Sequence, residues 1–375
     1  MERATIDAVL KEAVDAGLVP GLVAAVTDAR DVRFEAAYGR ARFESGVPMS
    51  VDSVFRIASM TKAVTALGFM MLVEDGLLDL DAPFGRYFPR FVQPPVLASF
   101  DPRTGACSTR PARAPVTLRQ LLAHTSGFGY WFLSPALRAQ LRGDPDYFDA
   151  PFLLHEPGER FTYGIGADVA GQAIEPVTDM PLAEFFARRL FEPLGMRDTG
   201  WALPPADRLV GLHQRTESSF TERPLETAAE TPRAGGALYS TARDYLRVLR
   251  LLLNRGRVDG ERLLAPESCA AIVSNQIGPL VAERQRSAAP DRTNDFAFMD
   301  GSQKFGLGVL VETRDRPGMR SAGSFGWAGI FNTYFWADPA AGIAAVLLTQ
   351  SSPFADAATL GLWERFERAV YRALR

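Results

Sequence analysis

The chain has 375 residues, of which 47% are hydrophobic and 23% are charged, and its formal net charge is −3. This composition is typical of a globular protein with a large core and room for two lobes. The lack of a basic stripe or tail argues against nucleic acid or an anionic membrane as a partner, and the longest apolar stretch, residues 63–73, is far shorter than the roughly 20 residues that cross a bilayer.

The first elements expected along the chain are a helix and a strand pair. Residues 3–16 have apolar side chains at helical spacing. Residues 22–27 and 32–38 are short β-prone runs, and the four residues between them, Asp28-Ala29-Arg30-Asp31, are typical of a hairpin turn. The first 21 residues carry charges in place of an apolar leader, so we expect a cytoplasmic protein.

The next segment, residues 58–73, is apolar nearly all round and ends at Asp75-Gly76, which predicts a buried helix. Its only cation, Lys62, follows Ser59 by three residues, and on a helix these positions share one face. Only three of the 41 basic residues are lysines (Lys11, Lys62 and Lys304). Unlike arginine, a desolvated lysine can lose its proton and act as a base. The pair therefore predicts a nucleophile and its base in the S-x-x-K spacing, although a lysine that merely reaches the surface would fit the same spacing.

The middle of the chain, residues 91–233, is rich in proline, glycine and short helical patterns, and we predict a mostly helical inserted lobe there. The clearest helical patterns are residues 118–123, 166–174 and 182–190. Residues 100–115 and 285–293 are rich in loop-forming residues.

The C-terminal part returns to strands, at residues 306–312, 330–336 and 343–349, and ends in a helical pattern at residues 357–374. Together with the N-terminal pair, these strands predict an α/β (α+β) fold in which an antiparallel sheet of about five strands is flanked by helices. The predicted α/β domain is discontinuous, with residues 1–90 and 234–375 on either side of the lobe.

The cysteines and histidines give little support to other kinds of site. Cys107 and Cys269 are isolated and the three histidines are scattered, so we predict no metal, no disulfide framework and no cofactor. A Ser-His-Asp triad would need one of these histidines, but His124 begins a His-Thr-Ser-Gly segment that is better interpreted as a braced loop, and His155 precedes a turn. No G-x-S-x-G segment occurs, so the nucleophile elbow of α/β-hydrolases is missing.

Five motifs occur in the order seen in serine hydrolases of the class C β-lactamase and penicillin-binding-protein fold. They are Ser59-x-x-Lys62, LLAHTSG at residues 121–127, EPGERFTY at residues 156–163, AGGALYST at residues 234–241, and Trp327-Ala328-Gly329. Over residues 6–374 the chain resembles the family VIII carboxylesterases of this fold. The resemblance implies the β-lactamase/DD-peptidase-like architecture and an acyl-serine intermediate on Ser59.

The resemblance also implies roles for two further residues. Tyr163 stands at the tyrosine of the family's Y-x-N motif, where a phenol beside Lys62 can relay a proton. Without the resemblance, Tyr163 would equally fit a core tyrosine that caps the turn at Pro157-Gly158. The backbone N–H of Ile330 is placed opposite that of Ser59, as a pair of oxyanion donors.

Two departures from the β-lactamase pattern concern the substrate. Trp327 replaces the lysine of K-T-G, and Ile165 replaces the asparagine two residues after the tyrosine. Both changes remove a polar partner for β-lactams and peptides, and so favour uncharged esters. Arg320, seven residues before Trp327, would supply a substitute cation if its side chain reached the site. Tyr130 and Trp131 are predicted to wall the substrate pocket together with Ile165, Trp327, Ala328 and Gly329.

The predicted function is therefore a carboxylic-ester hydrolase that acts on short-chain uncharged esters, with Ser59 as nucleophile, Lys62 as base and Tyr163 as relay. Three alternatives remain open: a β-lactamase or DD-peptidase-like amidase, an acyltransferase to an alcohol, and a binding protein that keeps the fold without the chemistry. The expected partner is a small-molecule ester, with neither nucleic acid nor membrane, and the oligomeric state is left open.

Overall fold

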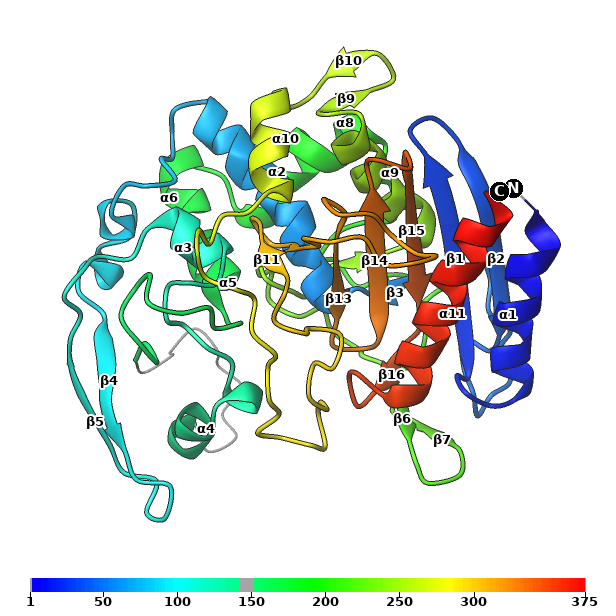
Figure 1. Ribbon diagram of the computed structural model, residues 1–375, viewed down its shortest axis with the longest axis horizontal. Helices are drawn as coiled ribbons and strands as arrows, with labels where there is room; N and C mark the ends of the chain where they lie inside the picture. Colours follow the sequence, from blue (N-terminus) through cyan, green and yellow to red (C-terminus); the bar gives the residue numbers. More distant parts are fainter. Residues whose placement is uncertain (1, 142–151, 375) are drawn as a thin grey trace.

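The computed structural model describes residues 2–141 and 152–374, and its centre is a seven-stranded antiparallel sheet (Figure 1). The strand order is β11-β12-β13-β14-β15-β1-β2, so the two ends of the chain meet in one sheet. The strands are β1 (Gly21–Asp28), β2 (Val32–Gly39), β11 (Lys304–Phe305), β12 (Leu310–Val311), β13 (Phe325–Gly329), β14 (Thr333–Asp338) and β15 (Ile343–Leu348). The predicted antiparallel sheet with flanking helices is confirmed.

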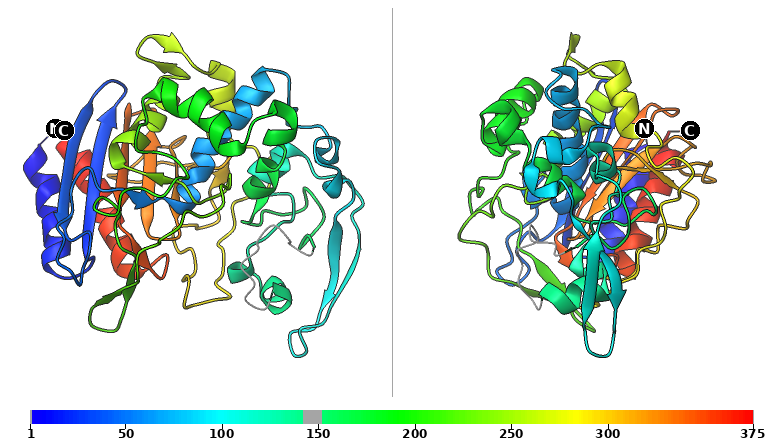
Figure 2. Two further views of the ribbon diagram at one scale, coloured as in Figure 1. Left: turned by 180° about the vertical axis from the view of Figure 1, so that it is seen from behind. Right: turned by 90° about the vertical axis from the view of Figure 1, so that its left-hand side faces the viewer.

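Side chains of β1 and β15 alternate between two apolar cores, as the period of two in a strand requires. On one face, Leu22 and Leu347 pack with helices α1 (Arg3–Asp15) and α11 (Ala357–Ala373). On the other face, Val23 and Val346 belong to the larger core. Figure 2 shows α1 and α11 side by side on one face of the sheet, with most of the other helices on the far side. The near-continuous apolar character of both strands follows from burial on both faces.

The larger core surrounds helix α2 (Thr61–Glu74), which a 3₁₀ turn at Ala58–Met60 precedes. All residues of α2 from Thr61 to Leu72 are buried, as the all-round apolar pattern predicts. Helices α9 (Ala242–Leu253) and α10 (Pro266–Val273) lie on the same side of the sheet. Lys62 is therefore enclosed, whereas Lys11 is exposed on α1 and the half-buried Lys304 donates its ammonium to the carbonyls of Gly278 and Leu280.

The sheet has two more strands than the sequence predicts. The predicted strand at residues 306–312 is wrong except at residues 310–311, which form β12. Residues 306–309 turn at Gly308, which has a φ of +83°, and β11 precedes the predicted run. Strand β13 has two glycines in five residues and lacks an alternating apolar pattern, and for this reason it was not predicted as a separate strand. The predicted strand at residues 330–336 is wrong in its first three residues, which form the turn between β13 and β14.

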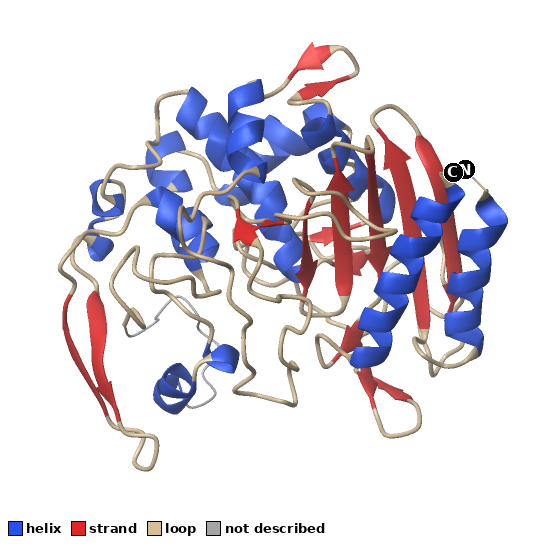
Figure 3. Ribbon diagram, in the orientation of Figure 1, coloured by secondary structure: helices blue, strands red, loops and turns tan. Residues whose placement is uncertain are grey.

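Short helices dominate the described parts of residues 91–233, and two of the predicted helices are broken (Figure 3). The pattern at 166–174 forms α5 and α6, and the pattern at 182–190 forms α7 and a π-helical turn, Ala187–Phe191. The helices are α3 (Leu118–Leu122), α4 (Pro135–Leu141), α5 (Gly166–Gly171), α6 (Ile174–Thr178), α7 (Leu182–Phe186) and α8 (Glu192–Leu194). A hairpin of β4 (Pro95–Phe100) and β5 (Cys107–Pro111) extends from this region. None of the helices in the described part of the chain is both long enough and apolar enough to cross a membrane.

Four further strand pairings among the described residues lie outside the main sheet. Strand β3 (Phe55–Arg56), directly before Ser59, pairs with β8 (Tyr239–Ser240) and so ties the nucleophile segment to the AGGALYST motif. The others join β9 (Arg257–Val258) with β10 (Glu261–Arg262), and β6 (His213–Arg215) with both β7 (Phe220–Glu222) and β16 (Ser351–Ser352).

Candidate active site

Ser59 lies at the start of the turn that leads into α2, and the residue before it has an unusual backbone. Ala58 has a φ of +45°, a left-handed conformation that costs an alanine of the order of 1 kcal/mol. The surrounding structure holds it there, because the Ile57 N–H donates to the carbonyl of Leu238. The side chain of Ser59 is half-buried and faces a cavity.

The amine of Lys62 contacts three oxygen atoms, and none of them belongs to a carboxylate. Nζ lies 3.1 Å from Ser59 Oγ, 2.9 Å from Tyr130 Oη and 2.7 Å from the carbonyl oxygen of Gly235. Only the carbonyl is obliged to accept, since a hydroxyl can donate or accept. The same three contacts can therefore be made by an ammonium or by a neutral amine that accepts the Ser59 proton.

The Gly235 carbonyl is held in place from its other side. The Gly235 N–H donates to Asp168 Oδ1 at 2.8 Å, and Asp168 is itself buried. A side chain at position 235 would collide with this carboxylate, because an added Cβ would lie 2.5 Å from Asp168 Oδ2. The AGGALYST motif thus contributes a glycine backbone that binds both the amine of Lys62 and a carboxylate.

Tyr163 and Trp327 come together beside Ser59. The indole Nε1–H of Trp327 donates to Tyr163 Oη at 3.1 Å, and the two rings pack edge to face. Lys62 Nζ lies 5.1 Å from the centre of the Tyr163 ring. Tyr163 is 3% exposed, and its backbone N–H donates to Gln285. Trp327 therefore places a hydrogen-bond donor on the phenol oxygen of Tyr163.

Tyr130 and Trp131 lie differently from the prediction that both wall the pocket. Tyr130 lines the cavity, and its hydroxyl also contacts Lys62, which the sequence did not indicate. Trp131 lines neither of the cavities at Ser59 and instead packs against Phe132 and a separate apolar cluster, so that prediction is wrong. Successive side chains of a 3₁₀ turn point about 120° apart, and it is Phe132 that faces Ser59.

Ile330 lies in the turn between β13 and β14 and lines both cavities at Ser59. Its backbone N–H donates no hydrogen bond to any described residue, so it is available to a ligand. Asn332 stabilises the turn: its N–H donates to the Gly329 carbonyl, its φ is +58° and it is fully buried.

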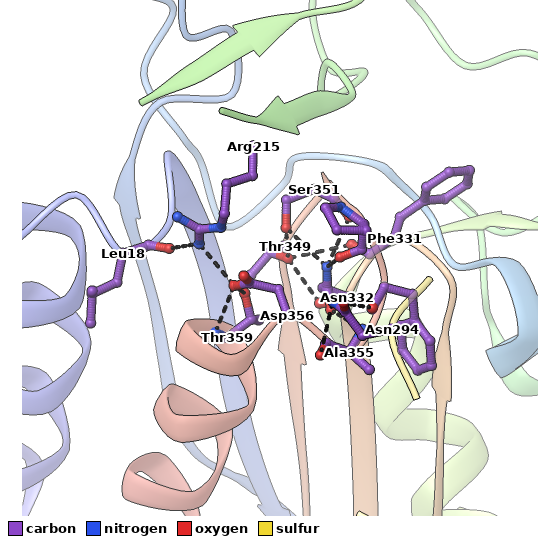
Figure 4. Close-up of polar contacts among 12 residues, drawn as sticks. Leu18, Arg215, Asn294, Phe331, Asn332, Thr349, Ser351, Ala355, Asp356 and Thr359 are labelled. Carbon is purple, nitrogen blue, oxygen red and sulfur yellow. Dashed lines mark hydrogen bonds and ion pairs between the residues drawn. The ribbon is translucent and has the colours of Figure 1, made fainter. Parts of the chain in front are cut away.

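The side chain of Asn332 makes five hydrogen bonds, four of which anchor the turn to the segment after β15 (Figure 4). It donates to the carbonyl and hydroxyl oxygens of Ser351 and to the carbonyl of Pro353, and it accepts from the N–H of Ala355 and from Oη of Tyr334, which lies in β14. Nearby, Arg215 bridges the Leu18 carbonyl and Asp356, which caps α11 by accepting from the Thr359 N–H. The turn that presents Ile330 is thus part of the rigid frame of the sheet.

The other predicted pocket residues divide into one that lines a cavity at Ser59 and two that do not. Ala328 lines the smaller cavity. Ile165 is buried before α5, and Gly329 packs on the backbone of Ile57, with no room for a side chain because an added Cβ would lie 2.3 Å from the Ile57 carbonyl oxygen. The prediction that Ile165 and Gly329 contact substrate directly is therefore wrong, because both are enclosed by the core and line neither cavity at Ser59.

Two cavities meet at Ser59, Phe132 and Ile330, and they differ in size and polarity. The larger has a volume of about 710 Å³ and includes exposed residues such as Arg223 in its wall, so it opens to solvent. The smaller has a volume of about 20 Å³, close to the space that one water molecule occupies. Apart from Ser59, its wall is apolar or aromatic, with Phe132, Tyr163, Phe296, Trp327, Ala328, Ile330 and Phe354.

None of the three histidines contacts Ser59. His124 braces its loop as predicted: it has a φ of +58°, and its Nδ1 accepts from the N–H of Gly164. His155 contacts the Glu156 carbonyl and Thr162, and His213 contacts the Gln350 carbonyl. Within residues 2–141 and 152–374 no group of three His, Cys, Asp or Glu residues is arranged to hold a metal ion.

Burial lowers the pKa of all three histidines below the ordinary value of 6.5, and for His124 the charge of Lys62 lowers it further. Below pH 6.5 the histidines of the unfolded chain bind protons, whereas those of the folded chain stay neutral. The contribution of these histidines to the free energy of unfolding is therefore fully present above this pH and is lost as the pH falls. We expect the free energy of unfolding to decrease between pH 7 and pH 5, by at most about 1.4 kcal/mol per pH unit for each histidine. Urea titrations at several pH values measure this slope.

His213→Gln tests this expectation away from Ser59, because a glutamine amide can still donate to the Gln350 carbonyl. In this variant the decrease in the free energy of unfolding per pH unit should be smaller by up to the contribution of one histidine, about 1.4 kcal/mol. An unchanged slope would contradict the role assigned to His213.

Arg320 does not supply the cation that Trp327 lacks. Its guanidinium is buried and pairs with both carboxylate oxygens of Glu367, at 2.8 and 2.5 Å. It lines neither cavity at Ser59. Arg320 therefore brings no positive charge to either cavity at Ser59.

The family model that matches the chain is described as Beta-lactamase, and the match covers residues 6–369. Lovastatin esterase of Penicillium rubens is 30% identical, over 98% of each chain. Monacolin J acid methylbutanoyltransferase of Aspergillus terreus is 28% identical, over 98% of this chain and 95% of that protein.

Among solved structures, a mutant of simvastatin synthase (LovD) from Aspergillus terreus superposes with a TM-score of 0.85. It is 29% identical, and the match covers 99% of this chain and 97% of that one. The match runs through both the sheet and the helical region, so it concerns the whole architecture.

Proposed function

The chain belongs to the Beta-lactamase family, and within it we propose that this protein is a serine carboxylesterase that acts on short-chain esters through an acyl-Ser59 intermediate. The observation that carries the proposal is the 3.1 Å contact between Lys62 Nζ and Ser59 Oγ, at the junction of the two cavities. The esterase named among the relatives supports it.

In the proposed first step, Lys62 accepts the hydroxyl proton of Ser59 while Oγ bonds to the ester carbonyl carbon. The N–H groups of Ser59 and Ile330 stabilise the oxyanion of the tetrahedral intermediate. The bond from this carbon to the alcohol oxygen then breaks, and the proton passes through Tyr163 to the leaving alcohol. In the second step, water gives a proton back along the same path, through Tyr163 to Lys62, as its oxygen bonds to the acyl carbon. The bond from this carbon to Ser59 Oγ then breaks, Ser59 regains its proton from Lys62, and the free acid leaves.

The sizes of the two cavities favour opposite ends of an ester. The acyl group stays on Ser59 through both steps, whereas the alcohol must leave and water must enter. The small apolar cavity of about 20 Å³ therefore suits a short acyl chain, and the large cavity suits the alcohol. A volume near that of one water molecule favours acetyl over longer chains.

A second candidate function is transfer of the acyl group to an alcohol. The cavity of about 710 Å³ can hold an acceptor alcohol in place of water, and a relative named as a methylbutanoyltransferase supports this alternative. Product analysis with and without an added alcohol distinguishes the two: a transferase forms the new ester faster than the free acid.

We expect wild-type enzyme to hydrolyse nitrophenyl acetate or butyrate with a kcat/KM at least about 100-fold above that for cephalosporins or D-Ala-D-Ala peptides. The reason is that Trp327 leaves no cation on β13 beside Ser59, and a missing charged hydrogen bond of about 3 kcal/mol corresponds to this ratio. Trp327→Lys should reduce this ratio of kcat/KM values, mainly by raising kcat/KM for the carboxylate-bearing substrates. Equal rates on nitrocefin and nitrophenyl butyrate would instead favour the amidase alternative.

A further inference from the structure

The wall of the larger cavity carries more positive than negative charge. It contains four arginines (Arg56, Arg223, Arg233 and Arg292) and two acids (Asp168 and Glu230). Such a surplus beside a nucleophile attracts an anionic ligand, provided that the guanidinium groups are not already neutralised. Their partners therefore decide which of them can bind one.

Two of the four arginines are neutralised by neighbouring carboxylates. Arg56 forms ion pairs with Glu226 and Glu230, and Arg233 forms an ion pair with Glu230 at 2.6 Å. The charge of Asp168 acts on Arg233 as well. These five groups form a network in which each arginine is matched by at least one acid.

Arg292 and Arg223 have no such partner within the described part of the chain. The side chain of Arg292 is half-buried and makes neither a hydrogen bond nor an ion pair with any described residue. The Arg223 guanidinium donates only to the neutral amide oxygen of Gln214, at 2.8 Å. Two guanidinium groups thus face the cavity without a carboxylate.

The backbone of Arg292 is fixed although its side chain is unpaired. Its N–H donates to the Ala289 carbonyl at 2.9 Å, and its carbonyl accepts from the N–H of Phe354 at 3.0 Å. Phe354 lines the smaller cavity, so this segment is joined to the wall that would enclose the acyl group. A long side chain on a fixed backbone loses less freedom when it binds than one on a free loop.

We propose that Arg292, together with Arg223, binds a carboxylate or phosphate group on the alcohol portion of the substrate. This inference rests on the proposed esterase function and specifies its substrate: a short-chain ester, with acetyl favoured, of a larger anionic alcohol. The guanidinium fork matches either anion through paired hydrogen bonds. This charge lies at the end of the alcohol that is far from the reacting carbonyl, so it needs no cation at the position of Trp327.

The test compares 4-acetoxybenzoate with its neutral methyl ester, methyl 4-acetoxybenzoate, in the wild type and in Arg292→Gln and Arg223→Gln. Comparing variants with the wild type removes the difference in intrinsic reactivity between the two esters. We expect Arg292→Gln to lower the ratio of kcat/KM for the anionic ester to that for the neutral ester about tenfold, chiefly through KM. The matched control is Arg286→Gln, an exposed arginine of the same segment that lines neither cavity.

Two further arms complete the design. 4-Acetoxyphenyl phosphate tests whether the site prefers phosphate to carboxylate. The preferred anion is the one whose kcat/KM ratio to the neutral ester falls more in Arg292→Gln. Binding of 4-hydroxybenzoate, followed by NMR titration, tests the arginine site without any hydrolysis, and its Kd should rise about tenfold in Arg292→Gln. If wild type hydrolyses neither ester, the proposed function fails, and this binding measurement still decides the inference.

The inference is overturned if the ratio and the Kd are unchanged in both Arg292→Gln and Arg223→Gln. It is also overturned if Arg286→Gln lowers the ratio as much as Arg292→Gln, because the effect would then come from the overall charge of the surface.

Discussion

Ser59→Ala and Lys62→Met are each expected to lower kcat for nitrophenyl acetate by about 10⁴-fold or more, the scale found when a nucleophile or its base is removed. Ser59→Ala removes the atom that forms the acyl-enzyme. Lys62→Met keeps the shape of the buried side chain but cannot accept a proton, and it leaves no charge in the core. Lys62→Arg tests the same point with a group that stays charged, although the larger guanidinium must fit a site that is 1% exposed.

The measurements are steady-state kinetics, labelling by a fluorophosphonate and thermal unfolding. Labelling also tests the alternative of a binding protein without chemistry, because only an activated serine reacts. Lys11→Arg and Lys304→Arg are controls that should leave kcat and labelling unchanged. A Lys62→Met variant that keeps more than a tenth of the wild-type kcat would contradict the assignment of Lys62 as the base.

Tyr163→Phe is expected to lower kcat by about 10²–10⁴-fold, the usual contribution of a positioned proton donor. The indole N–H of Trp327 donates to the phenol oxygen, so it stabilises that oxygen when the proton is given to the leaving alcohol. Tyr130→Phe removes a contact of Lys62 while the Gly235 carbonyl still holds the amine, and we expect a loss of about tenfold for one hydrogen bond.

The order of these two effects decides the assignment, because both tyrosine rings lie close to Lys62, at 5.1 and 5.3 Å from Nζ. A larger loss in Tyr130→Phe would make Tyr130 the relay and contradict the role given to Tyr163. Trp327→Phe in the Tyr163→Phe background should then have little further effect, since the indole acts through the phenol oxygen. Tyr38→Phe, on the far edge of the sheet, is the matched control.

The sequence predicted those elements whose periodicity is strong. The all-round apolar pattern of α2 and the buried strands β1 and β15 are found close to the predicted bounds. The family resemblance, drawn from five ordered motifs, is confirmed by the family match. Local pattern failed where glycines interrupt a run, because pairing with neighbouring strands decides the outcome. It predicted one strand across Gly308, where a turn separates β11 from β12, and it predicted no strand at β13.

Site features that depend on contacts between distant residues were not predictable. The contact between Lys62 and Tyr130 joins positions 68 apart in the chain, and Arg292 lies in a segment that the sequence marked only as loop-forming. Trp131 was assigned to the pocket because aromatic residues often line pockets, but the adjacent Phe132 faces it. Periodicity shows which positions lie on one face of an element, but it cannot show which element that face meets.

The distribution of amines also matters for chemical coupling of the protein to a support. Amine-directed reagents need an exposed, unbonded primary amine. Lys62 is enclosed, and the Lys304 amine is engaged by two carbonyls, whereas Lys11 is exposed on α1 at the edge of the molecule away from α2 (Figure 1). Among the lysine side chains, attachment should therefore occur almost entirely at Lys11, which orients every molecule alike with respect to the support.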